Sequence, residues 1–194
     1  MGDDRSADRR GSDRSPDQQA SAGTRRPSAD TALLLDVMLG KLSTYLRMCG
    51  YDAAYALDRE ARSASERPNG EERCDDPRGV DADDELLELA ESENRLLVTR
   101  DVELARRADG LLLETTDVTD QLRELADAGF ALELSEPSRC ASCNGQLERL
   151  APATRTPEHA PDSQKTTVWR CRDCGQHFWK GSHWESVAET LSEL

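Results

Sequence analysis

Hydrophobic positions between residues 32 and 50 change from a continuous run to a helical spacing. The run Ala32–Leu35 ends at Asp36, which predicts a buried parallel strand that finishes at a carboxylate. Apolar residues then recur at steps of three and four as far as Gly50, which predicts an amphipathic helix that stops at this glycine. The expected apolar face of the helix consists of Met38, Leu39, Leu42, Tyr45, Leu46 and Cys49.

The alternation of strand and helix patterns continues to about residue 130. Strands that alternate with helices indicate a parallel α/β sheet. Asp83 and Asp101 stand at the starts of two predicted helices, where each has the side chain of an N-cap. The further predicted strands cover 53–57, 95–99 and 110–115, and the further predicted helices cover 83–94, 102–107 and 117–129.

Two polar stretches interrupt this pattern. Residues 1–30 have almost no apolar side chains and cannot bury enough surface to offset chain entropy, so we expect a disordered tail. Residues 58–82 are rich in Arg, Glu, Pro, Gly and Asp, and we expect a flexible insertion there. The remaining sequence divides into an α/β domain over 31–135 and a C-terminal segment over 136–194. The change of composition near Pro137 predicts that the two parts fold independently.

Two Cys-x-x-Cys pairs mark the C-terminal segment. This spacing lets both sulfurs of a tight knuckle reach one ion, and two knuckles complete a tetrahedral thiolate site. No coordination position stays open, so the pattern predicts a structural zinc ribbon; the alternative is two disulfides or unlinked thiols. Gly145 and Gly175 follow the pairs, where we expect backbone turns at positive φ. The predicted ligands are Cys140, Cys143, Cys171 and Cys174.

Three acidic residues are expected at one edge of the sheet. Asp36 ends the first predicted strand and Asp101 follows the third, so both lie at the carboxyl edge, where α/β folds bind ligands. Asp83 opens the helix that leads into the third strand. Carboxylates that meet there repel one another, and Mg²⁺ or Mn²⁺ would neutralise them and support phosphodiester hydrolysis. The alternative is that Asp83 and Asp101 are only helix caps.

Six stretches of the chain carry a resemblance to a known family. They are Asp36–Asp52, Asp83–Ala90, Leu97–Asp101, Arg139–Gly145, Trp169–Gly175 and Trp179–Trp184. With these motifs in this order, the chain resembles the Mut-seven C-terminal RNase family, a branch of the PIN-like nucleases, over about residues 32–186. The resemblance implies a PIN-like three-layer α/β fold with a parallel sheet, a metal-dependent ribonuclease site and an appended zinc ribbon. The insertion over 58–82 is longer than the resemblance leads us to expect.

The same resemblance implies roles for individual residues. Asp36, Asp83 and Asp101 would be the catalytic acids that bind Mg²⁺ or Mn²⁺, and RNA would be the substrate. Asp84 is an alternative for the middle acid, and Glu103 is a further candidate. Two rival interpretations remain open. In the first, the acids are helix caps and the chain is a non-catalytic adaptor that binds RNA through its zinc ribbon. In the second, the chain is a structural module that binds other proteins.

The charge of the chain bears on its partner. There are 39 acidic and 25 basic residues, which give a net charge of −14, and lysine occurs at only three positions. This composition is typical of adaptation to a cytoplasm of very high salt, where attraction to phosphate is weak in any case, so the acidity does not exclude RNA. The chain contains no run of about 18 apolar residues and no apolar signal segment, so we expect a cytoplasmic protein without a membrane span.

Several basic and aromatic residues are candidates for RNA contacts. One lies beside Asp101, and three others form a cluster next to the ribbon, where a Trp ring can stack on bases. The alternative is that the charges are solvated and the Trp rings cover the thin core of the ribbon. We expect Lys41 and Arg47 to be surface charges. The candidates are Arg100, Lys180, His183 and Trp184.

Overall fold

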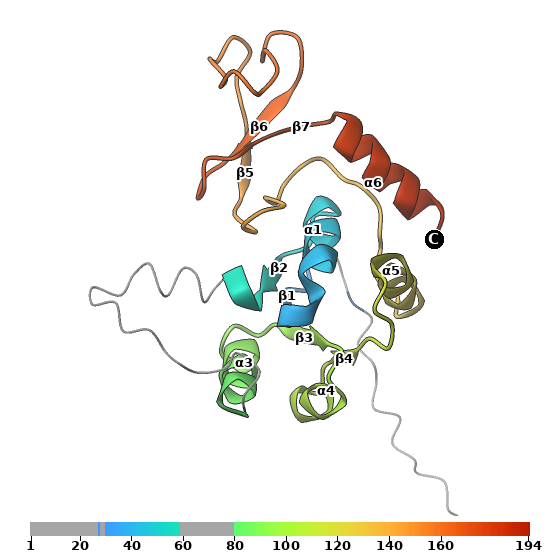
Figure 1. Ribbon diagram of the computed structural model, residues 1–194. Coiled ribbons are helices and arrows are strands. Elements are labelled where there is room, and N and C mark those ends of the chain that lie inside the picture. Colours follow the sequence, from blue (N-terminus) through green and yellow to red (C-terminus); the bar gives the residue numbers. More distant parts are fainter. Residues whose placement is uncertain (1–26, 28–29, 59–79) are drawn as a thin grey trace, which may run out of the picture.

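The computed structural model describes residue 27, residues 30–58 and residues 80–194 of the chain (Figure 1). The predicted tail over 1–30 and the predicted insertion over 58–82 therefore lie almost wholly outside the described residues.

A four-stranded parallel sheet forms the centre of the α/β part. Its strand order is β2-β1-β3-β4, and β1 (Leu33–Leu35) is a central, fully buried strand. Leu35 lies opposite Tyr55 of β2 and Val98 of β3. The predicted parallel α/β fold is therefore confirmed. The other strands are β2 (Ala53–Tyr55), β3 (Leu96–Thr99) and β4 (Leu111–Leu112).

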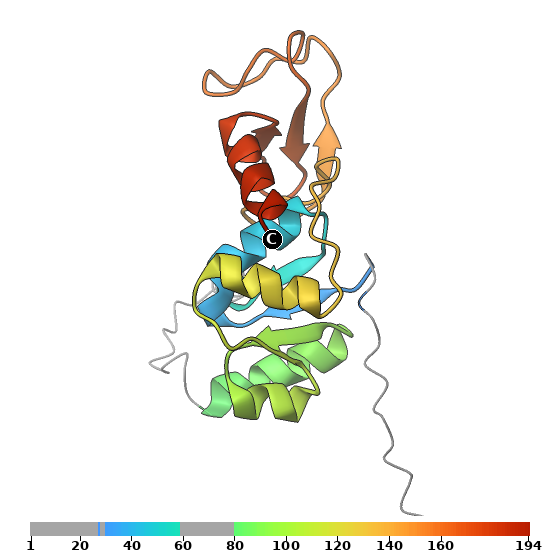
Figure 2. The same ribbon diagram turned by 90° about the vertical axis from the view of Figure 1, so that its right-hand side faces the viewer.

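Helices cover both faces of the sheet (Figures 1 and 2). Side chains alternate between the two faces of a strand, so Leu33 and Leu35 enter the core beneath α1 and α5, whereas Leu34 enters a second core beneath α3 and α4. The molecule thus has a helix layer, a sheet and a second helix layer. The helices are α1 (Gly40–Met48), α5 (Val118–Asp127), α3 (Val80–Ser92) and α4 (Val102–Ala108).

The predicted helix after β1 differs from the observed one at its start. A 3₁₀ turn, η1 (Val37–Leu39), precedes α1, and its tighter winding takes Met38 out of the apolar stripe, so that Met38 is 50 % exposed. Leu39, Leu42 and Leu46 are buried as predicted. The second strand ends earlier than predicted because the chain is helical from residue 56, and the fourth strand comprises only two residues.

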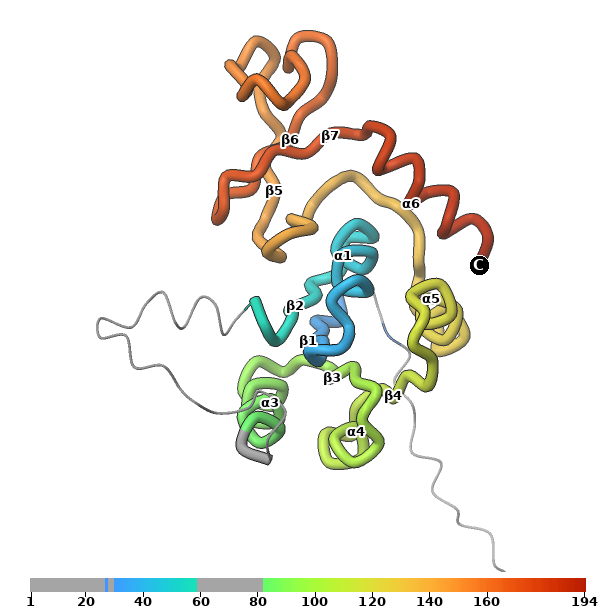
Figure 3. Tube along the Cα trace, in the orientation of Figure 1, coloured from blue at the N-terminus to red at the C-terminus, as the bar shows by residue number. Residues whose placement is uncertain are grey.

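The C-terminal segment forms a three-stranded antiparallel sheet with strand order β5-β6-β7. Helix α6 (Ser182–Ser192) follows it and returns toward α5, where Leu191 packs against the core of the α/β part (Figure 3). The ribbon is therefore followed by a helix that packs on the first domain. The strands are β5 (Leu147–Arg149), β6 (Val168–Cys171) and β7 (His177–Trp179).

Of the helices within residues 30–58 and 80–194, none has the length and apolar character that a membrane span requires.

Candidate functional site

Asp36 is held rigidly at the carboxyl edge of the sheet. It directly follows β1, and its backbone N–H donates to the carbonyl of Val98 on β3 at 3.1 Å. Its side chain is buried, accepts a hydrogen bond from the N–H of Val37 and so caps η1. The sequence did not predict this cap, because a single 3₁₀ turn leaves no periodic pattern.

Thr99 connects Asp36 to Asp101. The hydroxyl of Thr99 donates to Oδ2 of Asp36 at 2.8 Å, and its oxygen accepts the N–H of Asp101 at 3.0 Å. Thr99 is fully buried at the end of β3. Sequence reasoning missed this residue, although its position at the end of a strand beside the one that Asp36 ends was a usable signal.

Asp101 caps α4, as predicted. Its Oδ1 accepts the N–H of Leu104 at 2.8 Å, while the structure records no partner for Oδ2 among the residues it describes. The side chain is exposed. Capping uses one carboxylate oxygen, so the other can still bind a ligand, and the cap and the site interpretations do not exclude each other.

Asp83 lies in the first turn of α3 and is not its N-cap, because the helix begins at Val80. That prediction was wrong because the helix extends into the polar stretch that we assigned to the insertion. Burial raises the pKa of Asp83, and the negative charges of Asp101 and Asp36 raise it further. Asp83 therefore lies within electrostatic reach of both Asp101 and Asp36.

The three acids do not form a closely packed group. Within the described part of the chain, only the four cysteines bring three or more metal-ligating atoms within 4.8 Å of one another. The acids instead surround an edge at which Asp36 is fixed and buried, while Asp83 and Asp101 reach it from the ends of two helices.

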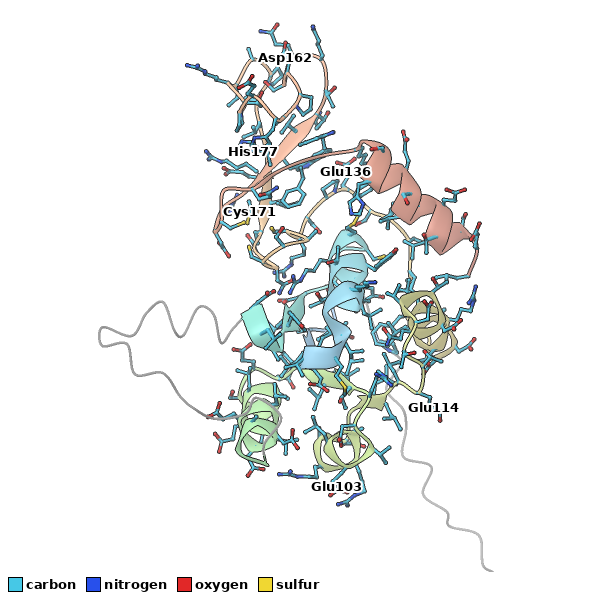
Figure 4. All side chains as sticks on the ribbon, in the orientation of Figure 1. Glu103, Glu114, Glu136, Asp162, Cys171 and His177 are labelled. Atoms are coloured by element: carbon cyan, nitrogen blue, oxygen red, sulfur yellow. The ribbon has the colours of Figure 1, made fainter. Side chains whose placement is uncertain are left out.

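The two additional acidic candidates are engaged elsewhere. Asp84 is exposed and pairs with Arg107 of α4. Glu103 lies on the outer side of α4 and pairs with Arg106 at 2.6 Å (Figure 4). Its pKa is lowered, first by the hydrogen bond from Arg106. Both side chains are bound to arginines on the surface.

Arg100 lies near enough to Glu124 of α5 for its charge to act on that carboxylate. Although burial raises the pKa of Glu124, hydrogen bonds from Thr115 and Glu114 and the positive charge of Arg100 lower it overall. The Nε atom of Arg100 is buried and has no hydrogen-bond partner among the described residues. Arg100 is therefore partly buried beside the acidic edge, not fully solvated.

The four predicted zinc ligands converge. Their sulfur atoms all lie within 4.8 Å of one another, with Sγ of Cys140 and Cys174 3.7 Å apart and Sγ of Cys143 and Cys171 3.5 Å apart. A tetrahedral ion with Zn–S bonds of about 2.3 Å requires sulfurs about 3.8 Å apart. The arrangement of these thiols fits zinc.

Close packing behind the four-cysteine cluster requires a glycine at position 145, and backbone conformation favours a glycine at position 175. A Cβ atom on Gly145 would lie 2.9 Å from Sγ of Cys171 and 2.6 Å from Oδ2 of Asp173, so this position has no room for a side chain. Gly175 has φ of +75°, as predicted, whereas in the first knuckle Asn144 takes the positive φ of 64° that we expected at Gly145.

The first cysteine knuckle (Cys140–Cys143) and the residues beside it bind directly to the α/β part. Asn144 accepts the N–H of Ala53 through Oδ1 at 3.1 Å and donates through Nδ2 to Asp52 at 2.7 Å. Arg139 pairs with Asp52 at 3.1 Å. These contacts fix the knuckle to the edge strand β2.

Arg47 is buried, and the prediction of a surface charge was wrong. Only 2 % of it is exposed, and it donates to the carbonyl of Ala53 at 2.8 Å, to the carbonyl of Ala141 at 3.0 Å and to Asp58 at 2.9 Å. The three acceptors come from β2, from the first cysteine knuckle and from the helical residues 56–58 that follow β2. Helical spacing alone could not reveal this, because all three acceptors lie outside the helix and one of them is 94 residues away in sequence.

The basic and aromatic cluster after the ribbon is partly assembled. Nζ of Lys180 lies 5.1 Å from the centroid of the Trp184 ring and 3.3 Å from a carboxylate oxygen of Glu136. His183 is exposed in the first turn of α6. Trp169 is buried, as the alternative interpretation expected for at least two of the three Trp rings, whereas Trp179 is 37 % exposed.

Comparison with known proteins identifies the family. No curated protein and no solved structure matches the chain. The family profile described as the Mut7-C RNAse domain matches residues 31–191, which include the sheet, the three acids and all four zinc-ligand candidates. The family name points to a ribonuclease-like function with RNA as the substrate. Since the match covers most of the chain, this protein belongs to the Mut7-C RNAse domain family.

Proposed function

We propose that the protein is a metal-dependent ribonuclease of PIN-like architecture, with its site at the carboxyl edge formed by β1 and β3. The observation that carries the proposal is the placement of Asp36 and Asp101 at the ends of two neighbouring strands, where both are hydrogen-bonded to Thr99. Asp83 lies near enough for the charges of these two acids to add to the effect of burial in raising its pKa. Carboxylates gathered at one sheet edge are the arrangement that a hard divalent cation stabilises.

The donor set supports the choice of ion. The three side chains offer carboxylate oxygens and no nitrogen or sulfur, which suits Mg²⁺ or Mn²⁺, whereas the four thiolates of the ribbon suit zinc. A bound Mg²⁺ or Mn²⁺ would supply an activated water and a positive charge against the phosphate.

The residues of the chain contribute orientation and charge. Hydrogen bonds from Thr99 and Val37 fix the carboxylate of Asp36. Its side chain therefore loses little conformational entropy when it binds a cation. The carboxylate of Asp83 accepts no hydrogen bond from any described residue, and Oδ2 of Asp101 is equally without a described partner, so both can bind a cation. Arg100, Lys180, His183 and Trp184 would bind RNA.

The test is cleavage of labelled single-stranded RNA with added Mn²⁺ or Mg²⁺, at low and at high salt. Asp36→Asn and Asp83→Asn should each abolish cleavage and weaken Mn²⁺ binding measured by calorimetry. Glu103→Gln is the matched control. It also removes one carboxylate from the same region, but Glu103 pairs with Arg106 on the surface.

The outcomes separate the rival functions. Cleavage by the Asp36→Asn protein at the parent rate would remove Asp36 from the site. RNA binding without cleavage under any metal would favour the non-catalytic adaptor, and the absence of both would favour a protein-interaction module.

A further inference from the structure

The ribbon differs in charge from the rest of the chain. Residues 139–181 contain seven basic and four acidic side chains, a net charge of +3, although the whole chain carries −14. The other residues therefore carry −17 together. An anion approaching this protein meets the least repulsion at the ribbon.

The basic side chains of the ribbon fall into two groups. Those in ion pairs are Arg139 with Asp52, Lys180 with Glu136, and Arg170 and Arg172 with Glu148. Arg149, Arg155 and Lys165 form no ion pair with any residue in the described part of the chain. Arg149 is the last residue of β5, and Arg155 and Lys165 lie in the loop that connects β5 to β6. Their charges are thus available to a ligand.

Two of these cations line a pocket of about 500 Å³. The pocket lies between the end of β5 and the segment before β6, and no carboxylate lines it. Gln164, Thr166 and Thr167 add amide and hydroxyl groups to its wall. Arg149 donates to the hydroxyl of Thr167 at 3.3 Å, which holds its guanidinium group against the wall.

The wall chemistry specifies the ligand. Cations and hydroxyl groups without an opposing carboxylate suit phosphate oxygens and ribose hydroxyls. No aromatic ring lines the pocket, so it offers no platform on which a base could stack. We propose that this pocket binds the sugar–phosphate backbone of single-stranded RNA, with Arg149 and Lys165 in contact with phosphate.

The position of the pocket gives it a specific role, which rests on the proposed ribonuclease function. Asp162, in the ribbon loop, and Glu103, on the outer side of α4, lie at opposite ends of the molecule, and α4 is the helix that Asp101 caps (Figure 4). The acidic edge and the ribbon loop are well separated in both ribbon views (Figures 1 and 2). Only an RNA that spans this separation contacts both sites, so the pocket favours long substrates and is indifferent to sequence.

The experiment compares two double variants that remove the same charge from the same ribbon. Arg149→Gln with Lys165→Gln changes the pocket, and Arg170→Gln with Arg172→Gln changes the cations that pair with Glu148. Binding of fluorescent oligouridylates of about 6 and about 30 nucleotides is measured by anisotropy over a range of salt, in an Asp36→Asn background that prevents cleavage. Zinc content confirms that each ribbon is folded.

We expect the pocket variant to bind the long RNA roughly tenfold more weakly, with a salt dependence reduced by about 1.4 in the slope of log K against log salt. The short RNA should lose much less affinity, and the control variant should keep most of its affinity for both. Equal losses in the two variants would overturn the proposal in favour of general charge attraction. Unchanged affinity in the pocket variant, or no RNA binding by the parent, would also overturn it.

Cleavage assays on the same substitutions without the Asp36 change separate this proposal from the proposed function. If the parent cleaves RNA and the pocket variant has the same KM for long RNA, the pocket proposal fails and the ribonuclease stands. If the pocket variant loses binding but the parent never cleaves, the ribonuclease fails and the binding site stands.

Discussion

The hydroxyl of Thr99 donates a 2.8 Å hydrogen bond to Oδ2 of the buried Asp36. Through the same oxygen, Thr99 accepts the N–H of Asp101 at 3.0 Å, so one side chain connects two of the three acids. The register of the sheet produces this contact. Leu35 lies opposite Val98, so Asp36, which follows Leu35, lies beside Thr99, which follows Val98. Thr99 therefore acts as a positioning residue for the acidic edge.

Thr99→Val should test this role, because valine keeps the shape of threonine and removes both hydrogen bonds. The oxygen of Asp36 and the N–H of Asp101 would each lose a partner, and we expect a loss of about 1–3 kcal/mol in the free energy of unfolding. RNA cleavage should fall by about 100-fold if the acids shift by an ångström. Denaturant titration and a cleavage assay with Mn²⁺ measure the two effects.

Thr99→Ser is the matched control, since it keeps the hydroxyl, and it should restore most of the cleavage rate. A valine variant that cleaves RNA like the parent would show that the hydrogen bonds do not position the acids. If the serine variant is as inactive as the valine variant, the defect comes from altered packing at this fully buried site and not from the lost hydrogen bonds.

The sequence predicted the elements whose pattern is local. The run before Asp36 and the run before Asp101 are short and apolar, and their order along the chain was enough to place both acids at one edge. The four cysteines were equally predictable, because their spacing alone defines the zinc geometry.

The sequence did not predict contacts made by single polar side chains to distant partners. Arg47 looked like a surface charge, because nothing in its neighbourhood shows that the carbonyl of Ala141, 94 residues away, accepts its hydrogen bond. The start of α3 was misplaced for a related reason. Polar residues around Val80 suggested a loop, whereas the helix begins there and places Asp83 inside its first turn.

Arg47→Met should strongly destabilise the protein. Methionine fills similar space but leaves two carbonyls and the carboxylate of Asp58 without their donor. Because the arginine is buried and Asp58 is only partly exposed, we expect a loss of about 3 kcal/mol in the free energy of unfolding. Arg123→Met is the control, since Arg123 forms an exposed pair with Asp120 one turn away and should cost about 0.5 kcal/mol or less. Similar losses in both variants would contradict the role of Arg47.

Asp52 should make the stability of the junction between β2 and the first cysteine knuckle depend on pH in the acid range. Burial raises the pKa of Asp52, but hydrogen bonds from Arg95 and Asn144 and the charges of Arg95 and Arg139 outweigh burial, so its pKa lies below the ordinary value. A carboxyl with a lowered pKa stabilises the fold above the unfolded-state pKa of about 3.9. That stabilisation disappears as the pH falls through the lower folded-state value.

Melting curves of the parent and of Asp52→Asn between neutral and acid pH measure this effect. The parent should be the more stable protein at neutral pH, and the difference should shrink as the pH falls below about 4. A difference in melting temperature that stays constant over this range would show that the charge of Asp52 does not stabilise the junction.

Cys143→Ser should affect both parts of the molecule. We expect the variant to lose zinc, because three thiolates no longer complete the tetrahedral site. The knuckle that then loosens carries the carbonyl of Ala141, which accepts from Arg47, and the side chain of Asn144, which accepts from Ala53. Loss of these partners should weaken the edge strand β2, contrary to the independent folding that the sequence suggested.

Hydrogen exchange at the backbone N–H of Ala53 distinguishes coupled from independent folding. This group donates to Asn144 of the knuckle and belongs to β2 of the α/β part, so its protection reports the junction directly. In the Cys143→Ser protein we expect faster exchange at Ala53 and a lower melting temperature for the whole chain, while Leu34, in the buried central strand, keeps its protection at temperatures below the melt. Ser142→Ala is the control, because it alters an exposed residue of the same knuckle and retains all four thiols. If Ala53 in the zinc-free variant exchanges as slowly as in the parent, the ribbon is an independent unit and the contacts of Arg47 and Asn144 add nothing to the stability of the sheet.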